Sequence, residues 1–104
     1  MARVIWSPQA REDLRGVVQF IRRDSGIIGA AVGHRIVEST RRLARFPRSG
    51  RIVPEFRLTN IREVIIQSHR VIYEVAGDRI HILTVIHGAR QLERPVISGR
   101  RSDD

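Results

Sequence analysis

The chain has 104 residues, a length that favours one domain with a single modest hydrophobic core. Hydrophobic residues make up 41% and charged residues 29%, proportions typical of globular proteins, and no apolar run reaches the roughly 20 residues of a membrane span. The absence of cysteine excludes disulfides and thiolate metal sites. Together with an N-terminus that lacks a signal-peptide pattern, it predicts a cytoplasmic protein.

Charge is the most informative property of the composition. Nineteen basic residues, all of them arginine, face eleven acidic ones, for a net charge of +8. A genome rich in arginine codons is sufficient to explain the missing lysines. The net charge nevertheless predicts an acidic partner, either nucleic acid or an acidic protein surface. Arginine suits both, because its planar guanidinium binds phosphate or carboxylate through two parallel hydrogen bonds.

A short strand at residues 3–6 and two helices are predicted in the first half of the chain. Ser7 is a good N-cap for the first helix, and Pro8 fits its first position. The apolar residues of this helix recur on one face: Ala10, Leu14, Val17, Val18 and Ile21. A break at residues 24–29 precedes a second apolar stripe: Ile28, Val32, Ile36 and Leu43. The short connection predicts a helical hairpin.

Two glycines, Gly29 and Gly33, fall within the predicted second helix. Glycine in a helix costs about 1 kcal/mol relative to alanine. Each glycine therefore either weakens the helix or permits close packing against the first helix.

Three strands are predicted after a loop at residues 46–54, which two prolines and a glycine enforce. The strands span three ranges joined by short turns: 61–66, 70–75 and 79–87. Strands connected in this way must be antiparallel. With the N-terminal strand they predict an α+β fold, in which the helical hairpin packs on one face of a mainly antiparallel four-stranded sheet. The other face should be open unless a partner covers it.

Because side chains alternate along a strand, the sequence also predicts which residues face the core. The mainly apolar sets should lie beneath the helices: Ile80, Ile82, Thr84 and Ile86 in the last strand, and Val71, Tyr73 and Val75 in the strand before it. The mixed sets, which in the last strand also contain Leu83 and Val85, should face outward. They would present Arg70, His81 and His87, joined by Arg62, as an anion-binding surface.

Each of these polar residues also has a purely structural interpretation. His87 could simply end its strand, while Arg62 and Arg70 could pair with Glu63 or Glu74 across strands. Structural roles are expected for three further residues: a core position for Tyr73 with its hydroxyl satisfied at an edge, and solvated positions for His34 and His69.

The densest basic cluster surrounds the end of the second helix and comprises Arg41, Arg42, Arg45, Arg48 and Arg51. It is either a docking site for an acidic partner or a solvated helix end. Arg90, just beyond the last strand, is another candidate contact. No histidine pair has the helical spacing of a zinc site, and no glycine-rich loop joins a strand to a helix, so neither a metal site nor a cofactor is predicted.

Four segments within residues 4–92 resemble, in order and spacing, the ParE-like branch of the RelE/ParE superfamily, the toxins of type II toxin–antitoxin pairs. They read "WSPQAREDL", "RLARFPRSGRIVPE", "IREVIIQSHRVIYEVAGDRIHIL" and "VIHGARQL". The resemblance implies one toxin domain, at residues 1–94, in which a helical hairpin packs on an antiparallel sheet; we expect residues 95–104 to be a frayed polar tail. It also implies an acidic antitoxin, encoded alongside, whose extended and helical segment wraps the toxin in a hetero-oligomer.

The resemblance implies two alternative targets. ParE-type members inhibit DNA gyrase without enzymatic activity, whereas RelE-type relatives cut mRNA on the ribosome, which requires a general base, a general acid and cations on the phosphate. Arg62, Arg70 and His87 match or lie near positions of the nucleases' functional residues. The lysines of many such nucleases are absent, and arginine is a poor base because it stays protonated. Of the three, only His87 could titrate near neutral pH.

The leading hypothesis is therefore a ParE-like gyrase inhibitor with no catalytic residues, neutralised by its antitoxin. The alternatives are a ribosome-dependent mRNA endonuclease of the same fold and a degenerate antitoxin-binding module that is no longer toxic. Target or antitoxin contacts are expected among the same residues: Arg41, Arg42, Arg45, Arg48, Arg51, Arg62, Arg70, His81, His87 and Arg90.

Overall fold

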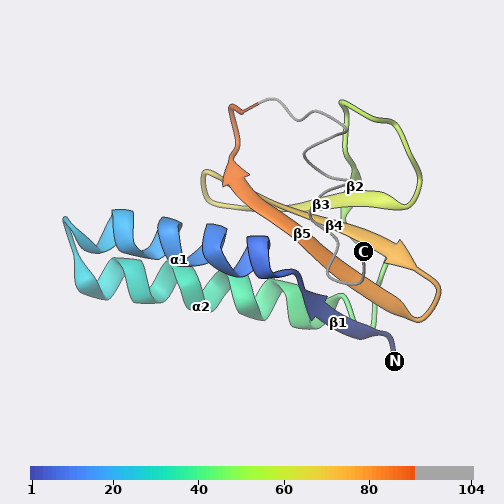
Figure 1. Cartoon of the computed structure of the whole chain (residues 1–104), viewed down its shortest axis with the longest axis horizontal. Helices are drawn as coiled ribbons and strands as arrows, with labels where there is room; N and C mark the ends of the chain where they lie inside the picture. The colour runs from blue at the N-terminus through green and yellow to red at the C-terminus, as the bar shows by residue number, and fades with distance from the viewer. Residues whose placement is uncertain (91–104) are drawn as a thin grey trace.

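Two antiparallel helices lie against one face of a twisted sheet in the computed structural model, which describes residues 1–90 (Figure 1). The elements in chain order are β1 (Arg3–Trp6), α1 (Pro8–Arg22), α2 (Gly26–Arg42), β2 (Arg51–Ile52), β3 (Ile61–Ile66), β4 (His69–Ala76) and β5 (Arg79–His87). The strand order is β1-β5-β4-β3-β2, with β1 parallel to β5 and the other pairs antiparallel. The predicted α+β class is confirmed, and β2 adds a short fifth strand. The predicted tail lies outside the described residues.

Both helices begin at a serine N-cap. The Ser7 hydroxyl oxygen accepts a hydrogen bond from the amide of Ala10 at 3.0 Å and donates to the Leu83 carbonyl at 3.3 Å, which ties the start of α1 to β5. Ser25 caps α2 by accepting from the amide of Ile28 at 3.2 Å. The predicted break at residues 24–29 is therefore too long, because α2 starts at Gly26. Ile28 was expected on the buried stripe but is exposed in the first turn.

Close packing explains the two glycines of α2. A Cβ atom at Gly29 would lie 2.5 Å from Cγ of Arg22 and 3.1 Å from the carbonyl oxygen of Val18. At Gly33 it would lie 2.9 Å from a methyl group of Val18. Of the two interpretations of these glycines, close helix–helix contact is the one that the structure supports.

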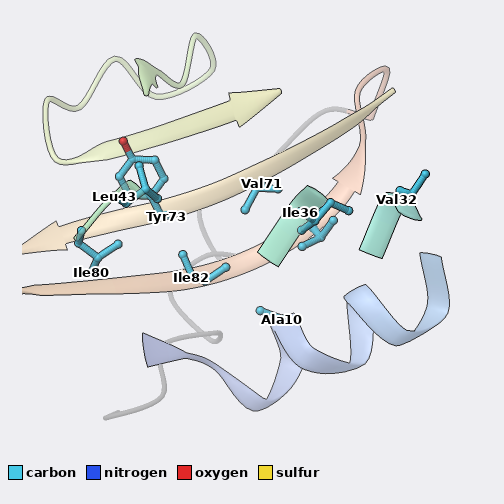
Figure 2. Close-up of a cluster of buried hydrophobic side chains, with 9 residues drawn as sticks. Ala10, Val32, Ile36, Leu43, Val71, Tyr73, Ile80 and Ile82 are labelled. Carbon is cyan, nitrogen blue, oxygen red and sulfur yellow. The ribbon is translucent and has the colours of Figure 1, made fainter. Parts of the chain in front are cut away.

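The main core fills the space between the helices and the sheet (Figure 2). It is formed by Ala10, Val32, Ile36, Leu43, Val71, Tyr73, Ile80, Ile82 and Val85. Tyr73 is fully buried, and its hydroxyl accepts a hydrogen bond from the amide of Gly50 at 2.9 Å. The prediction of a core tyrosine with a satisfied hydroxyl is confirmed.

A β-bulge changes the facing of side chains midway along β5. Ile72 pairs with Thr84 while Tyr73 pairs with Ile82, so Leu83 is an extra residue in β5. The predicted alternation holds up to this point and is wrong beyond it. Val85 joins the core beneath the helices, and Ile86 joins a second cluster.

The second face of the sheet is covered, contrary to the expectation of an open face. The chain between β2 and β3 folds back and places Val53, buried, and Phe56, half-buried, over the sheet. They pack with four buried strand residues: Ile61, Ile72, Leu83 and Ile86. This covering segment comes from the protein's own chain, and its apolar residues stand singly between turn residues, which hid them from periodicity arguments.

Asp13 of α1 accepts hydrogen bonds from the part of β5 that extends beyond its neighbouring strand β1. Its carboxylate accepts hydrogen bonds from the Thr84 hydroxyl at 2.5 Å and from the amide of Val85 at 3.3 Å. β1 pairs with β5 only as far as Ile82, so a helix side chain replaces a neighbouring strand there. Within residues 1–90, no helix is long and apolar enough to cross a membrane.

The helix contact at Gly29 can be tested against a matched glycine. We expect Gly29→Ala to lower the free energy of unfolding by about 1–3 kcal/mol, because overpacking outweighs the gain in helix propensity. Gly16→Ala in α1, where a Cβ meets nothing within 4 Å, should instead raise it by up to about 1 kcal/mol. Urea unfolding of both variants measures the difference. Equal stabilisation by the two substitutions would contradict tight packing at Gly29.

Candidate functional site

Arg70 is the centre of a buried ion-pair network on the face of the sheet opposite the helices. Its Nε donates to Glu63 at 2.6 Å, and its two terminal nitrogens donate to the two carboxylate oxygens of Glu55, each at 2.7 Å. One terminal nitrogen also donates to the carbonyl of Arg90 at 3.0 Å. The side chain of Arg70 is only 6% exposed and that of Glu63 is 0% exposed.

The network fixes the charge of Arg70. Its hydrogen bonds to Glu55 raise the pKa of Arg70 above the already high ordinary value, against the lowering effect of burial, and Glu63 contributes to the rise. The guanidinium therefore remains charged at every accessible pH. Arg70 lies on the predicted face, opposite the helices, but the expectation that it is exposed there is wrong, and the alternative of cross-strand pairing with Glu63 is confirmed.

Arg62 does not share a face with Arg70. The register places Arg62 beside Tyr73, which is on the helix face, and Glu63 beside Ile72, on the face of Arg70. The Arg62 side chain is used internally, since it donates to three backbone carbonyls: Thr59 at 3.0 Å, Arg48 at 3.1 Å and Gly50 at 2.9 Å. The expected grouping of Arg62 with Arg70 is wrong, because it required all arginines of the strands to point the same way.

These contacts surround the Tyr73 hydroxyl. Burial raises the pKa of Tyr73 above its ordinary value, and the Gly50 amide with the charges of Arg62 and Arg48 offsets this only in part. Tyr73 therefore stays a neutral phenol that holds the chain before β2 against the core.

His87 lies at the exposed end of β5, beside His69 of β4. The two rings are in edge contact with centroids 5.9 Å apart, and His87 Nδ1 accepts a hydrogen bond from the amide of Ala89 at 3.2 Å. Burial, followed by the nearby His87, lowers the pKa of His69. His69 is thus a half-buried strand residue, which corrects its expected solvated position in a turn.

The remaining candidates divide between interior and surface. His81 was expected to face outward but is 1% exposed. Arg90 is exposed just beyond β5, and only its backbone carbonyl takes part in the Arg70 network. His34 is exposed in α2, as expected.

The five arginines around the end of α2 are exposed, so this cluster is a surface. Arg41 pairs with Glu38 and Arg51 with Glu63, while Arg48 donates to the Thr59 carbonyl. Arg42 and Arg45 make no ion pair within residues 1–90. A hollow of about 410 Å³ lies between this cluster and β3.

The hollow runs along an unpaired stretch of strand. β2 pairs only with Arg62 and Glu63, so no strand among residues 1–90 pairs with the outer edge of β3 at residues 64–66. Ile65 on this stretch is 48% exposed. Basic side chains, an apolar residue and a free strand edge thus occur together on one side of the molecule.

Sequence reasoning missed Glu55 altogether. It stands in a loop between Pro54 and Phe56, and no periodic pattern marks its direction. A buried arginine requires a carboxylate partner, but the sequence offers eleven acidic residues and does not indicate which of them lies beside Arg70.

The importance of the network can be tested at Arg70. Arg70→Met should lower the free energy of unfolding by about 3–5 kcal/mol, because Glu63 would keep its buried charge with only Arg51 as partner. Arg41→Met, which removes the exposed pair with Glu38, should change it by about 1 kcal/mol or less. Chemical unfolding at pH 7 provides the comparison. Similar losses in the two variants would show that the Arg70 network is no more stabilising than a surface pair.

Comparisons with known proteins agree with this architecture. A family model described as the ParE toxin of the type II toxin-antitoxin system, parDE, matches residues 4–92. Toxin RelE2 of Caulobacter vibrioides is 30% identical over 91 residues, which cover 86% of this chain and 99% of the relative. A solved structure described as the chromosomal ParDE TA system from P. aeruginosa shares the fold, with a TM-score of 0.71 at 20% identity over 84% of this chain and 96% of that one. The chain therefore belongs to the ParE toxin family of type II toxin–antitoxin systems.

Proposed function

We propose that this protein is a ParE-type toxin that inhibits DNA gyrase by binding it and is neutralised by a co-encoded acidic antitoxin. One observation carries the choice of a binding mechanism over a nuclease. The residues that would serve a nuclease, Arg62, Arg70 and His87, do not converge on one site. Arg70 faces away from the helices, whereas Arg62 and His87 lie on the helix side, Arg62 beside Tyr73 and His87 beside His69 at the start of β4. His87 follows Ile86, the strand partner of Arg70, but its side chain lies on the opposite face of the sheet.

The surroundings of the three residues also disfavour cleavage of RNA. The Nε and both terminal nitrogens of Arg70 are hydrogen-bonded within the protein, so the guanidinium is not available as it stands to a scissile phosphate. Arg62 is bound to backbone carbonyls. Cleavage would need a cation beside the group that exchanges a proton, yet the guanidinium of Arg70 lies on the opposite face of the sheet from His87 and is bound to Glu55 and Glu63.

Ribosome-dependent cleavage of mRNA is the second candidate. It is favoured by the name of the relative Toxin RelE2, which is 30% identical. The gyrase proposal rests on the match to the ParE toxin family over residues 4–92 and on the dispersed positions of the three residues.

The two activities are separable with purified full-length protein. We expect it to abolish supercoiling of relaxed plasmid by gyrase, and to leave mRNA intact on translating ribosomes in a primer-extension assay. Protein preincubated with its antitoxin is the control and should restore supercoiling. Cleavage of mRNA with unaffected supercoiling, lost in His87→Ala, would establish the nuclease instead. Unchanged growth on expression without antitoxin would favour the degenerate module.

The antitoxin is expected to approach the exposed arginine cluster first. The positive field of a +8 protein attracts an acidic segment mainly while the two molecules approach each other. Charge in the arginine cluster should therefore affect the association rate. The hollow beside β3 and its free edge offer an extended segment apolar contact and backbone hydrogen bonds.

Replacement of Arg41, Arg42 and Arg45 by glutamine tests this approach. The association rate with the antitoxin should fall about tenfold at low salt and converge with that of the wild type at high salt, because screening removes the steering. The matched control replaces three exposed arginines elsewhere: Arg3, Arg57 and Arg79. Stopped-flow kinetics at two salt concentrations gives the rates. Equal slowing by both triple variants would assign the effect to net charge rather than to this surface.

A further inference from the structure

His69 and His87 form the cross-strand pair at the start of β4 and the end of β5. They are direct partners in the register, and their rings meet edge to face with centroids 5.9 Å apart. Both side chains line a hollow of about 490 Å³ between α1 and the ends of these two strands. The pair takes no part in the ion-pair network of Arg70 or in the arginine cluster, so it has a role of its own to explain.

The contact of His87 with the turn that follows β5 requires a neutral ring. Its Nδ1 accepts a hydrogen bond from the amide of Ala89 at 3.2 Å. An imidazolium carries a proton on both nitrogens and is a donor at each, so protonation of His87 replaces this bond by two N–H groups that face each other. The turn at Gly88 and Ala89 therefore loses one of its contacts with β5 when His87 becomes charged.

His69 is subject to a different constraint with the same consequence. Within residues 1–90, its Nδ1 is buried and has no hydrogen-bond partner. In the charged ring this nitrogen carries a proton, and a buried N–H without an acceptor costs free energy. A positive charge on both rings, whose centroids are 5.9 Å apart, adds repulsion. The lowered pKa of His69, caused first by burial and then by His87, has the sign that this geometry requires.

On the α1 side of the hollow, both carboxylates already have partners. Glu12 pairs with Arg15, and Asp13 accepts hydrogen bonds from the Thr84 hydroxyl and the amide of Val85. These contacts hold the two carboxylates in place and offset part of their attraction for a proton on the histidines.

On the strand side, the nearest formal charges are positive. Arg90 lines the same hollow and makes no ion pair within residues 1–90. Arg70 follows His69 in β4, but its guanidinium lies on the opposite face of the sheet, where two carboxylates balance it. A protonated histidine pair is therefore close to the positive charge of Arg90.

The turn after β5 also completes the Arg70 network. The amide of Gly88 donates to the Ser68 carbonyl at 2.7 Å, which joins the exit of β5 to the turn between β3 and β4. The carbonyl of Arg90 accepts from the Arg70 guanidinium at 3.0 Å. Residues 88–90 are therefore held between the histidine pair on one face of the sheet and Arg70 on the other.

We propose that His69 and His87 form a pH-sensitive latch, which holds residues 88–90 in place while both rings are neutral and weakens their attachment when the rings are protonated. The folded protein binds a proton at His69 less readily than the unfolded chain does, because its pKa is lowered by folding. The stabilisation is therefore complete above about pH 6.5 and is lost as the pH falls through the lowered pKa of His69. The latch is independent of the target that the toxin binds, so a negative supercoiling result has no bearing on it.

Amide hydrogen exchange, measured by NMR on the full-length protein, tests the latch. The protection factor of the Gly88 amide, which corrects for the intrinsic effect of pH on exchange, should fall about tenfold between about pH 7.5 and about pH 5.5. The amide of Val75 donates to the Asn60 carbonyl at 2.8 Å towards the other end of β4 and is the internal reference. Its protection factor should change by less than about twofold.

A variant without titratable rings should keep the protection of Gly88 at both pH values. His69→Gln combined with His87→Asn removes both imidazoles, while the asparagine oxygen still accepts from the amide two residues further on. His34→Gln removes an exposed histidine of α2 and should behave as the wild type does. A similar loss of Gly88 protection in the wild type and the double variant would overturn the proposal.

A titration of the wild type keeps the result independent of the folding of the double variant. The ring nitrogen resonances of His69 and His87 report protonation directly. Both rings should become charged over the same pH range in which the Gly88 amide loses protection. A ring of the pair that is already charged at about pH 7.5, or constant protection of Gly88 while both rings become charged, rules out the latch.

Discussion

The buried guanidinium of Arg70 is the interaction on which this side of the molecule depends. It joins strand β3 through Glu63, the covering segment through Glu55, and the exit from β5 through the Arg90 carbonyl. A buried charge is tolerated only when it is paired and fully hydrogen-bonded, so removal of any of these partners should lower the free energy of unfolding. The covering segment also carries Val53 and Phe56 of the second hydrophobic cluster, so the ion pair at Glu55 and these apolar contacts hold the same segment.

The β-bulge in β5 divides the apolar residues between the two faces of the sheet. If β5 alternated regularly through Leu83, with no bulge, Val85 would turn away from the helices and Ile86 would turn toward them. The main core gains Val85, and the second cluster gains Ile86 together with Leu83. A sheet covered on one side by helices and on the other by its own loop needs apolar residues on both faces, and the bulge supplies them from one continuous apolar run.

Much of this fold could be predicted from local patterns. Residues close together in sequence determine the start of α1 at Ser7 and Pro8 and the helical periodicity that follows. The same is true of the turn at Gly77, whose φ is 62°. The faces of the strands could not be predicted beyond Leu83, because nothing in "ILTVIHGAR" distinguishes a bulge from regular alternation. The site was the least predictable part. Whether Arg70 faces solvent or Glu55 depends on a loop with no periodicity, and the opposite facing of Arg62 depends on the β3–β4 register.

The arginines of the described chain divide into interior ones that hold the fold together and exterior ones that lie on the surface. Arg62 and Arg70 are positioned on strands, where a nuclease could use them, but here they hold backbone carbonyls and carboxylates. Arg42 and Arg45 are positioned where they contribute little to stability within the described chain, yet they add to the field that an acidic partner encounters. Interior arginines thus build the scaffold, and exterior ones contribute to the positive field at the surface. The proposed binding function requires such a surface and does not require a general base.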